Sequence, residues 1–480
     1  MKRREFLTLS SVAALYVITG YGGGGDSSTT PPGGGSSIPP DDITTKALPI
    51  PELLYPTDRE GRKHYDLNVQ EAKHDFFNSI ETDTFAINST YLGPTLLMQN
   101  GDNVSINYKN NLDELITMHG HGMHVPPSMD GTPHQPISPG ATWSAVYTVN
   151  QKACTNWYHP HTMDKTAEHV YKGLAGLIII EDSESRSLDL PKRYGIDDIP
   201  LVLQDRNFNN GQIVYNPGMM DIMRGYTGDT FIANGAIEPT LDLEAKEIRF
   251  RILNGSNSSV YELGFSDGRS FKQIATDNAF LESPVEMTRL TLSPAERAEI
   301  IVDLSNALNQ TIVLKEFRHS KDFITVNVSK SATATTTLPN NLTTLTKYDP
   351  STAARTRPFV LSGMMGSFEI NGKSMDIGRI DENVLLGDVE IWEVSNEMMV
   401  DHNFHIHATY FMLMERNGSA ANVAPNEKGY KDVVYIPSGE SVKFIVKMTD
   451  YADDTVPYMY HCHFLEHEDA GMMGQFVVTV

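Results

Sequence analysis

The feature that most constrains this sequence is an alternation of short β-rich runs and turn residues from about residue 46 onward, with no long helical period. A chain of this kind buries its apolar side chains between sheets, so the pattern is typical of β-sandwiches or barrels. At 480 residues the chain is too long for one such unit. A typical domain has about 150 residues, which suggests three domains. We therefore predict an all-β protein.

A weak internal repeat supports three similar units. Each copy has an approach segment, a turn and a strand that closes on an asparagine, at Asn110, Asn254 and Asn396. The copies are about 140 residues apart, a spacing that fits three β-sandwiches. The predicted units span residues 46–185, 186–330 and 357–480, and a linker rich in Ser, Thr, Ala and Pro spans 331–356.

The first residues resemble an export signal. Lys2-Arg3-Arg4 precede an apolar stretch that is too short for a confident membrane span, and the Arg-Arg-x-Phe-Leu pattern resembles a twin-arginine signal. Tyr21 stands where a lipoprotein would carry its lipidated cysteine, so we expect no membrane anchor there. Residues 1–21 are predicted to be this signal, residues 22–45 a disordered Gly/Ser/Pro linker, and the mature protein exported and periplasmic.

Charge and cysteine content exclude several classes of function. A net charge of −23 argues against nucleic acid or an anionic membrane as partner, because both need a basic surface. An acidic surface favours solubility and could also gather metal cations. Two cysteines exclude a disulfide framework. Cys462 lies between two histidines and is expected to be a ligand, whereas Cys154 is expected to be a small buried side chain.

Ten of the 16 histidines fall into four short clusters, all in the first and third predicted units. The clusters are His119-Gly120-His121-Gly122, His159-Pro160-His161, His402-Asn403-Phe404-His405-Ile406-His407, and His461-Cys462-His463 followed by His467. One His-x-His alone is weak, because on a strand it only puts two imidazoles on one face. Four clusters, one of them around a lone cysteine, indicate metal binding, since imidazole and thiolate are good copper and zinc ligands.

The last cluster is the most informative. Along an extended strand Cys462 points away from the face of His461 and His463, so one short segment contacts two metal sites. Cys462 and His467 need one more strong ligand for a trigonal blue-copper site, which His402 can supply, with Met472 as the weak axial thioether. Structural zinc is disfavoured because it closes a tetrahedron and would leave eight histidines over.

The four clusters resemble the motifs of three-domain multicopper oxidases, the family that includes laccases and bacterial copper-efflux oxidases. The motifs His-x-His-Gly, His-x-His, His-x-x-His-x-His and His-Cys-His-x-x-x-His-x-x-x-x-Met occur in order, and the similarity runs from about residue 46 to 480. The resemblance implies three cupredoxin-like Greek-key β-sandwich domains and four copper ions per chain. It also implies that one-electron oxidation of a reductant is coupled to four-electron reduction of dioxygen to water.

The resemblance also implies a role for each ligand. The type 1 copper, which accepts electrons, would be held by His402, Cys462, His467 and Met472. The type 2 copper would be held by His119 and His405. One type 3 copper would be held by His121, His159 and His463, and the other by His161, His407 and His461. The trinuclear cluster would then lie between the first and third units, and electrons would reach it from the Cys462 thiolate through His461 and His463.

Dioxygen reduction consumes protons, so acids are expected near the cluster. Asp130, just past the first motif, and Glu468, directly after His467, match acids that the family uses, with a solvated or turn carboxylate as the alternative. Glu466 is expected to be a surface carboxylate. The histidines that match no ligand position, expected to be satisfied polar side chains, are His124, His134 and His169.

The sequence also departs from the family pattern at three positions. Gly120 replaces the usual Trp of the first motif, Asn403 the usual Pro of the third, and Ala408 the Gly that often follows it. None of these changes removes a ligand, so copper binding is expected to persist, while packing or the reduction potential changes.

Three hypotheses for the reaction remain open. In the first, the reductant is cuprous ion. Four features favour this hypothesis: export, an acidic surface, an axial methionine and a tail similar to that of copper-efflux oxidases. Methionines, whose thioethers suit cuprous ion, also crowd segments of the third unit that are expected near the type 1 site: Met364, Met365, Met398, Met399, Met412, Met414 and Met473. Against it, the long Met-rich insertion of those oxidases is missing between Phe359 and His402, and Met is a common core filler.

The second hypothesis is a laccase-like oxidase of phenols and aromatic amines, which requires only an accessible edge of His467. The first two hypotheses are compatible, because one enzyme can oxidise both cuprous ion and phenols. The third is a non-catalytic blue-copper electron carrier or a copper-free structural relative. That class requires the loss of trinuclear ligands, and none is lost here. The sequence leaves the oligomeric state open.

Overall fold

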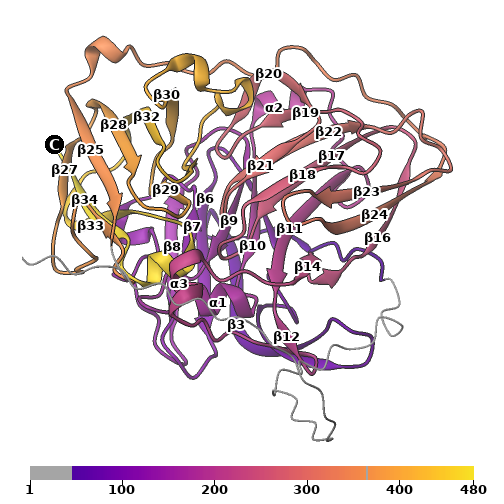
Figure 1. Cartoon of the computed structure of the whole chain (residues 1–480), viewed down its shortest axis with the longest axis horizontal. Helices are drawn as coiled ribbons and strands as arrows, with labels where there is room; N and C mark the ends of the chain where they lie inside the picture. Colours follow the sequence, from indigo (N-terminus) through magenta and orange to yellow (C-terminus); the bar gives the residue numbers. More distant parts are fainter. Residues whose placement is uncertain (1–45, 364–365) are drawn as a thin grey trace, which may run out of the picture. The chain divides into compact units, whose positions relative to one another are not determined.

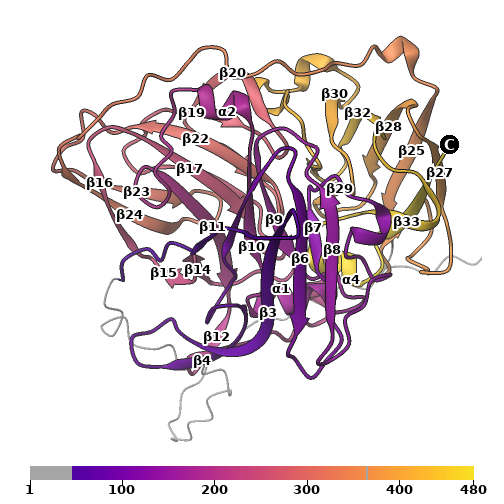
Figure 2. The same cartoon turned by 180° about the vertical axis from the view of Figure 1, so that it is seen from behind.

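Strands dominate the structure, a computed structural model that describes residues 46–363 and 366–480 (Figures 1 and 2). The predicted signal and Gly/Ser/Pro linker, together with Met364 and Met365, lie outside the described residues. Within those limits no helix has both the length and the apolar character needed to span a bilayer. The strands form three sandwiches in chain order, so the prediction of an all-β, cupredoxin-like fold is confirmed. The domain boundaries themselves stay predictions.

The first sandwich packs two sheets around Tyr65, Leu67, Leu96, Ile106 and Ile178. One sheet has the order β1 (Leu53–Leu54), β5 (Thr95–Gln99), β10 (Gly176–Glu181), β9 (Cys154–His159) and β7 (His119–His121). The other has the order β2 (Thr57–Arg59), β3 (Arg62–Asp75), β6 (Asn103–Asn110) and β8 (Thr142–Thr148), with β4 (Glu81–Ile87) paired to β3. Cys154 is buried in this core, as predicted.

The second sandwich has the largest core of the described chain, which includes Phe250, Ile252 and Ile300. Its larger sheet has the order β15 (Ala236–Ile237), β14 (Thr230–Ala233), β11 (Asp198–Arg206), β17 (Glu247–Asn254), β22 (Arg297–Asp303), β19 (Phe271–Ala275) and β20 (Phe280–Met287). Its smaller sheet has the order β16 (Thr240–Glu244), β24 (Lys321–Lys330), β23 (Thr311–Glu316), β18 (Tyr261–Phe265) and β21 (Leu290–Leu292). The short hairpin β12 (Phe208–Asn209) and β13 (Gln212–Ile213) lies outside both sheets.

The third sandwich, orange to yellow in Figure 1, packs around Phe359, Trp392, Phe404, Tyr460 and Phe476. One sheet has the order β26 (Glu369–Ile370), β25 (Arg355–Ser362), β28 (Val389–Asn396), β32 (Ser441–Lys447) and β30 (Phe411–Arg416). The other has the order β27 (Glu382–Leu385), β34 (Met473–Thr479), β33 (Asp453–His461), β29 (His402–Ile406) and β31 (Val433–Ile436).

The three repeat asparagines are structurally equivalent. Each ends a strand that pairs in parallel with an earlier strand of its own sandwich: β6 with β3, β17 with β11, and β28 with β25. Each buried side-chain amide donates to two main-chain carbonyls, and each side-chain oxygen accepts the N–H two residues later. The amide satisfies the polar backbone of the loop that follows the strand. In the third sandwich that loop leads directly into His402, so the repeat also helps to place a candidate ligand.

Short helices lie at the junctions between the sandwiches. The described α-helices are α1 (Thr166–Lys172), α2 (Ser183–Ser187), α3 (Met219–Arg224) and α4 (Leu465–Asp469). The Asp469 carboxylate at the end of α4 accepts hydrogen bonds from the backbone N–H groups of Thr166 and Ala167 at 3.0 and 2.9 Å. These N–H groups have no partner within α1, so the third sandwich caps a helix of the first.

Candidate metal centre

Eight histidines converge where the first and third sandwiches meet, and strand register explains why. In the first sandwich β7 pairs with β9 so that His119 lies opposite His159. In the third, β29 pairs with β33 so that His405 lies opposite His461. The remaining members follow on or just beyond these four strands: His121, His161, His407 and His463. All eight are buried, with exposed fractions of 1% or less.

The histidines form two triplets with inward-facing nitrogens. In one, the Nε2 atom of His461 lies 3.3 Å from Nε2 of His161 and 3.1 Å from Nε2 of His407. In the other, the Nε2 atom of His159 lies 3.4 Å from Nδ1 of His121 and 3.4 Å from Nε2 of His463. These are the same two triplets that the resemblance implied.

His119 and His405 each present one nitrogen that has no partner. The Nδ1–H of His119 donates to the carbonyl of Asp130 at 2.6 Å, and that of His405 to the carbonyl of Asp432 at 2.9 Å. The Nε2 atom of each ring is buried and has no hydrogen-bond partner among the described residues. A buried nitrogen without a partner carries a desolvation cost, so both atoms fit a missing electrophile such as a metal ion.

The environment keeps these rings neutral. Burial is the main cause that lowers the pKa of the histidines far below the usual value, and neighbouring imidazoles lower it further; this holds for His121, His159, His161, His405, His407 and His463. Neutral imidazole is the form that binds transition metals. The chemistry of the donor set therefore fits a metal cluster.

A second, separate group surrounds Cys462. Its Sγ atom lies 3.4 Å from Nδ1 of His402 and 3.9 Å from Nδ1 of His467, and these two nitrogens are 3.0 Å apart. Met472 is buried in the same core; its carbonyl accepts from the Cys462 N–H at 3.1 Å, and its N–H donates to the His467 carbonyl at 3.0 Å. Burial raises the pKa of the Cys462 thiol to about 12 and lowers that of His402 to about 3, so a thiolate here requires a cation beside it.

One segment links the two groups. β33 ends at His461, and Cys462 and His463 follow immediately. Although Cys462 lies just beyond the strand, side chains still alternate: its sulfur faces His402, while the flanking imidazoles face the cluster. Cys462 therefore belongs to one ligand group and its two neighbouring histidines to the other, as expected.

The two predicted acids touch the outer nitrogens of the clustered rings. The Oδ2 atom of Asp130 accepts from Nδ1 of His407 at 2.8 Å. The carboxylate of Glu468 lies 3.5 Å from Nδ1 of His161 and 3.2 Å from Nδ1 of His461. Both acids are fully buried, so neither is the solvated carboxylate of the alternative reading.

The expectation for Glu466 was wrong. Its side chain is 3% exposed and accepts hydrogen bonds from Asn257 at 2.9 Å and from Ser258, both in the second sandwich. Burial raises its pKa above the usual value, and these hydrogen bonds act in the opposite direction. The sequence shows only that Glu466 precedes His467. Its burial arises from a loop more than 200 positions earlier, and no local pattern reports that contact.

The expectation for the other histidines holds only in part. His134 is hydrogen-bonded to Gln475 through Nε2 at 2.5 Å. In contrast, Nε2 of His124 and both ring nitrogens of His169 are buried without a hydrogen-bond partner among the described residues.

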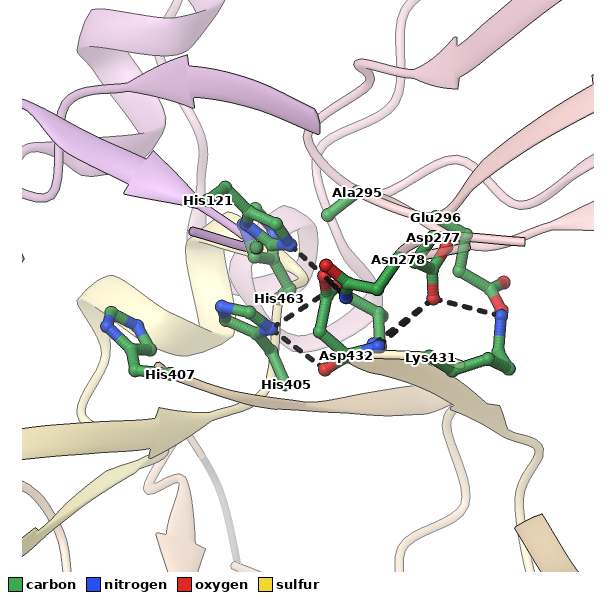
Figure 3. Close-up of polar contacts among 12 residues, drawn as sticks. His121, Asp277, Asn278, Ala295, Glu296, His405, His407, Lys431, Asp432 and His463 are labelled. Carbon is green, nitrogen blue, oxygen red and sulfur yellow. Dashed lines mark hydrogen bonds and ion pairs between the residues drawn. The ribbon is translucent and has the colours of Figure 1, made fainter. Parts of the chain in front are cut away.

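Two further residues beside the site were not found by sequence reasoning. Asn403 accepts the backbone N–H of His463 at 2.6 Å and donates to the carbonyl of Pro294 at 2.9 Å. Asp432 contacts His121 and His405 from outside the cluster (Figure 3). Position 403 was visible only as a departure from a motif, and Asp432 belongs to no histidine cluster.

Comparison with known proteins agrees with this geometry. Two family models, both described as multicopper oxidase, match residues 68–185 and 336–480. The multicopper oxidase mco of Staphylococcus haemolyticus is 36% identical over 438 residues, which cover 89% of this chain and 92% of that protein. The chain belongs to the multicopper oxidase family. A similar solved structure is the laccase of Pediococcus acidilactici, with a TM-score of 0.84 and 35% identity, covering 91% of this multicopper oxidase and 95% of the laccase.

A differently named relative is also similar to this multicopper oxidase. The cell division protein FtsP of Sodalis glossinidius is 37% identical over 452 residues, covering 91% of this chain and 93% of that protein.

Family membership makes copper the metal that the buried nitrogens and thiol would hold, and makes the protein an oxidoreductase that uses dioxygen and a reductant.

Proposed function

We propose that this multicopper oxidase takes electrons one at a time from cuprous ion and uses them to reduce dioxygen to water. The observation that carries the proposal is that Cys462 belongs to one buried ligand group while the adjacent His461 and His463 belong to the other. Copper, when bound, supplies one-electron acceptance at the first group and four-electron dioxygen reduction at the second. Cys462 and its two neighbours then give electrons a short covalent route between them.

The proposal includes four copper ions per chain. The type 1 ion is assigned to His402, Cys462, His467 and Met472, and the type 2 ion to His119 and His405. The type 3 pair is assigned to His121, His159 and His463 for one ion and to His161, His407 and His461 for the other. The distances within each group and the two unpartnered Nε2 atoms support this assignment.

Asp130 and Glu468 are proposed to hold and deliver the protons that water formation consumes. Each carboxylate is buried next to imidazoles of the cluster, where a proton can be kept without access to bulk water.

Glu468→Gln keeps the shape of the side chain but cannot release a proton. We expect its turnover number to fall about 10²–10⁴-fold with copper content unchanged.

The surroundings of the type 1 group support cuprous ion as the reductant. The thioether of Met398 lies 3.2 Å from Nε2 of His402, and Met399 beside it is 96% exposed. Beside the second histidine of the group, backbone atoms of Ile222 and Met223 in α3 contact the His467 ring, which is fully buried. A small soft ion can bind thioethers here, whereas a phenol needs an open histidine edge.

The methionine pattern differs in detail from the sequence expectation. α3 exposes Met219 and Met220, which lie in the second sandwich rather than in the expected part of the third. Met412 instead packs against the cluster of Ala279, Leu345 and Tyr430, away from the type 1 core. The thioethers proposed to receive cuprous ion therefore come from two sandwiches.

Two alternatives remain as outcomes of the test. A laccase-like oxidase of phenols and aromatic amines is favoured by the similarity to the Pediococcus laccase. A non-catalytic role, as a blue-copper electron carrier or a copper-free structural protein, is the second alternative; the FtsP relative, named for cell division, shows only that similar proteins carry names other than oxidase. Against a non-catalytic role, all predicted ligands are present and buried, the nitrogens of the clustered histidines are directed together, and a purely structural protein needs none of them.

The deciding experiment combines copper analysis with oxygen uptake. About four coppers per chain, an intense thiolate-to-copper absorption band and rapid oxygen uptake with a cuprous complex are expected. Phenol turnover should be modest without added copper.

Met398→Leu should weaken cuprous oxidation, and Met412→Leu serves as the matched control. One copper per chain would point to an electron carrier, and fast phenol turnover with slow cuprous turnover to a laccase.

The proposed setting is outside the cytoplasm. The Arg-Arg-x-Phe-Leu pattern near Arg3 supports export through the twin-arginine route, which carries folded proteins. Fractionation of cells that express the full chain, compared with an Arg3→Lys/Arg4→Lys variant, tests this. Accumulation of both proteins in the periplasm would contradict it.

A further inference from the structure

A buried carboxylate that no step of the proposed reaction uses lies against the cluster. Asp432 directly precedes β31 and is fully buried. Its Oδ1 atom accepts the Nε2–H of His121 at 3.0 Å, and its main-chain carbonyl accepts the Nδ1–H of His405 at 2.9 Å (Figure 3). One residue therefore contacts the outer nitrogens of two rings that we assign to two different copper ions.

His121 is oriented differently from the other seven rings. Since Asp432 accepts from its Nε2–H, the nitrogen left free to bind metal is Nδ1, which faces His159 at 3.4 Å. Five rings have their Nδ1 atoms occupied instead and present Nε2 inward: His119, His159, His405, His407 and His461. The last two, His161 and His463, approach their neighbours through Nε2. The geometry of one type 3 site thus depends on a hydrogen bond that fixes the opposite tautomer of His121.

Arg297 of the second sandwich holds Asp432 in place. Its Nη1 and Nη2 atoms donate to the two carboxylate oxygens of Asp432 at 2.7 and 2.6 Å. Nη2 also donates to Oδ1 of Asn156 at 2.7 Å and to the carbonyl of Asp277 at 3.1 Å. The guanidinium is fully buried and joins the first, second and third sandwiches at one point.

Further polar and charged groups of the second and third sandwiches complete this network. Asn278 donates to Oδ2 of Asp432 at 2.5 Å. The ammonium of Lys431 lies 3.1 Å from Asp277 and 3.0 Å from Glu296, and Asp277 also accepts the backbone N–H of Asp432 (Figure 3). Each buried charge therefore has an opposite charge beside it, as stability in a low-dielectric interior requires.

The chemistry of this arrangement is that of an outer partner of a metal ligand. A carboxylate that accepts from the non-binding nitrogen of a histidine fixes the ring's tautomer and orientation and raises its basicity. A bidentate arginine fixes the carboxylate in turn, because two parallel charge-assisted hydrogen bonds leave it little freedom. Lysine has the same charge but cannot make this fork.

We propose that Arg297 and Asp432 are positioning residues that select the Nδ1-binding form of His121, so that the second sandwich, which supplies no ligand, controls assembly of the type 3 pair. The inference rests on the proposed function for the identity of the metal. It does not rest on it for the tautomer, which is a property of the metal-free protein.

The first test therefore uses metal-free wild-type protein. Nitrogen-15 NMR of the histidine side chains distinguishes the two neutral tautomers, and a His121→Gln variant assigns the signal. We expect a proton on Nε2 of His121 and on Nδ1 of the other cluster rings whose Nδ1 atoms are hydrogen-bonded. A proton on Nδ1 of His121 would overturn the inference, whether or not the protein binds copper.

The second test uses copper-loaded variants. Arg297→Lys and Asp432→Asn should lose the near-ultraviolet absorption of the coupled copper pair and bind cluster copper about 10–100-fold more weakly, while the type 1 visible band remains. The matched control is Arg249→Lys, because Arg249 is another buried arginine of the same sheet whose partner, Glu299, contacts no proposed ligand. Full copper-pair absorption in both variants, or an equal loss in the control, would refute the proposal. A wild type without cluster copper would instead refute the proposed function.

Discussion

Gly131 illustrates how a residue without a side chain can decide where a metal ligand lies. It follows Asp130, whose carbonyl accepts from His119, and its φ angle is +75°. A Cβ atom at this position would lie 1.8 Å from the carbonyl oxygen of Met118 and 2.9 Å from Cα of His119. The chain can therefore pass this close to β7 only where residue 131 has no side chain.

We predict that Gly131→Ala destabilises the protein and lowers its type 2 copper content, because the added methyl displaces Asp130 from His119. Gly140→Ala is the control, since Gly140 also has a φ of +75° but no atom within 4 Å of the added carbon. The control should cost only about 1 kcal/mol, and Gly131→Ala about 1–3 kcal/mol more. Thermal unfolding and electron paramagnetic resonance measure both effects. Equal losses in the two variants would contradict the steric explanation.

Glu299 should make stability depend on pH in the acid range. Burial disfavours its carboxylate, but Arg249 and Arg251 outweigh burial and lower its pKa to about 2. Because the folded-state pKa is lowered, the stabilisation is complete above the ordinary glutamate pKa of about 4.3. It is lost as the pH falls from there toward about 2. Glu299→Gln should cost about 3–5 kcal/mol at neutral pH and flatten this slope in urea unfolding at a series of pH values. An unchanged slope would contradict the prediction.

At this scale the sequence predicts the ligands but not the residues that orient them. The ten clustered histidines and Cys462 are recognisable because strand geometry brings residues at short spacing into one site. Asp432 and Arg297 are 135 positions apart and meet only through packing of two sandwiches. Glu466 was misjudged for the same reason, because its burial depends on Asn257 and Ser258.

Among the elements, α3 has the clearest consequence for function. It has six residues, and none of them is buried, yet its backbone at Ile222 and Met223 contacts His467. A helix this short is not stable alone, so tertiary contacts hold it in place. Under the proposed type 1 assignment, α3 covers the edge of the His467 ring that large reductants would need to reach.

Replacing residues 219–224 by a Gly/Ser segment of equal length should therefore change the choice of reductant. We expect kcat/KM for a phenol to rise at least about tenfold, equal to about 1.4 kcal/mol, because the His467 edge becomes accessible. Cuprous oxidation should fall because Met219 and Met220 are lost. Oxygen uptake with both reductants measures this, and the same replacement in the exposed α2 helix is the control. Unchanged phenol turnover would show that α3 does not restrict access.

Sequence patterns predict the strands well and this helix poorly. The β-rich runs and the three closing asparagines repeat with a period, and each asparagine makes the same loop contacts in the structure. Met219 to Arg224 carries no such signal, because a helix of fewer than two turns has too few positions for a period. The sequence shows its methionines, but it does not show that the backbone of Met223 lies beside His467, 244 positions later.

Over the whole molecule, copper should act as a connection between the first and third sandwiches. Each proposed type 3 ion takes ligands from both, as the contacts of His161 with His461 and of His159 with His463 show. Binding to the folded protein alone adds free energy by mass action. The three sandwiches are then less independent than their separate cores suggest.

We predict that removal of copper lowers the melting temperature and that reconstitution restores it. At free copper about 1,000 times the dissociation constant, each site contributes about 4 kcal/mol. Cys462→Ser should lose only the type 1 contribution, because the cluster ligands remain. Differential scanning calorimetry of loaded, stripped and reconstituted protein measures the differences. Identical melting temperatures for loaded and stripped protein would rule out copper as a connection between sandwiches.

The ligands of the proposed copper cluster come from distant parts of the chain, and this sets an order of events during biosynthesis. The ribosome synthesises His119 and His161 long before His461 and His467. Until then the nascent chain has only isolated histidine pairs, which cannot enclose a redox-active ion. The proposed copper cluster can therefore assemble only after the third sandwich has been synthesised.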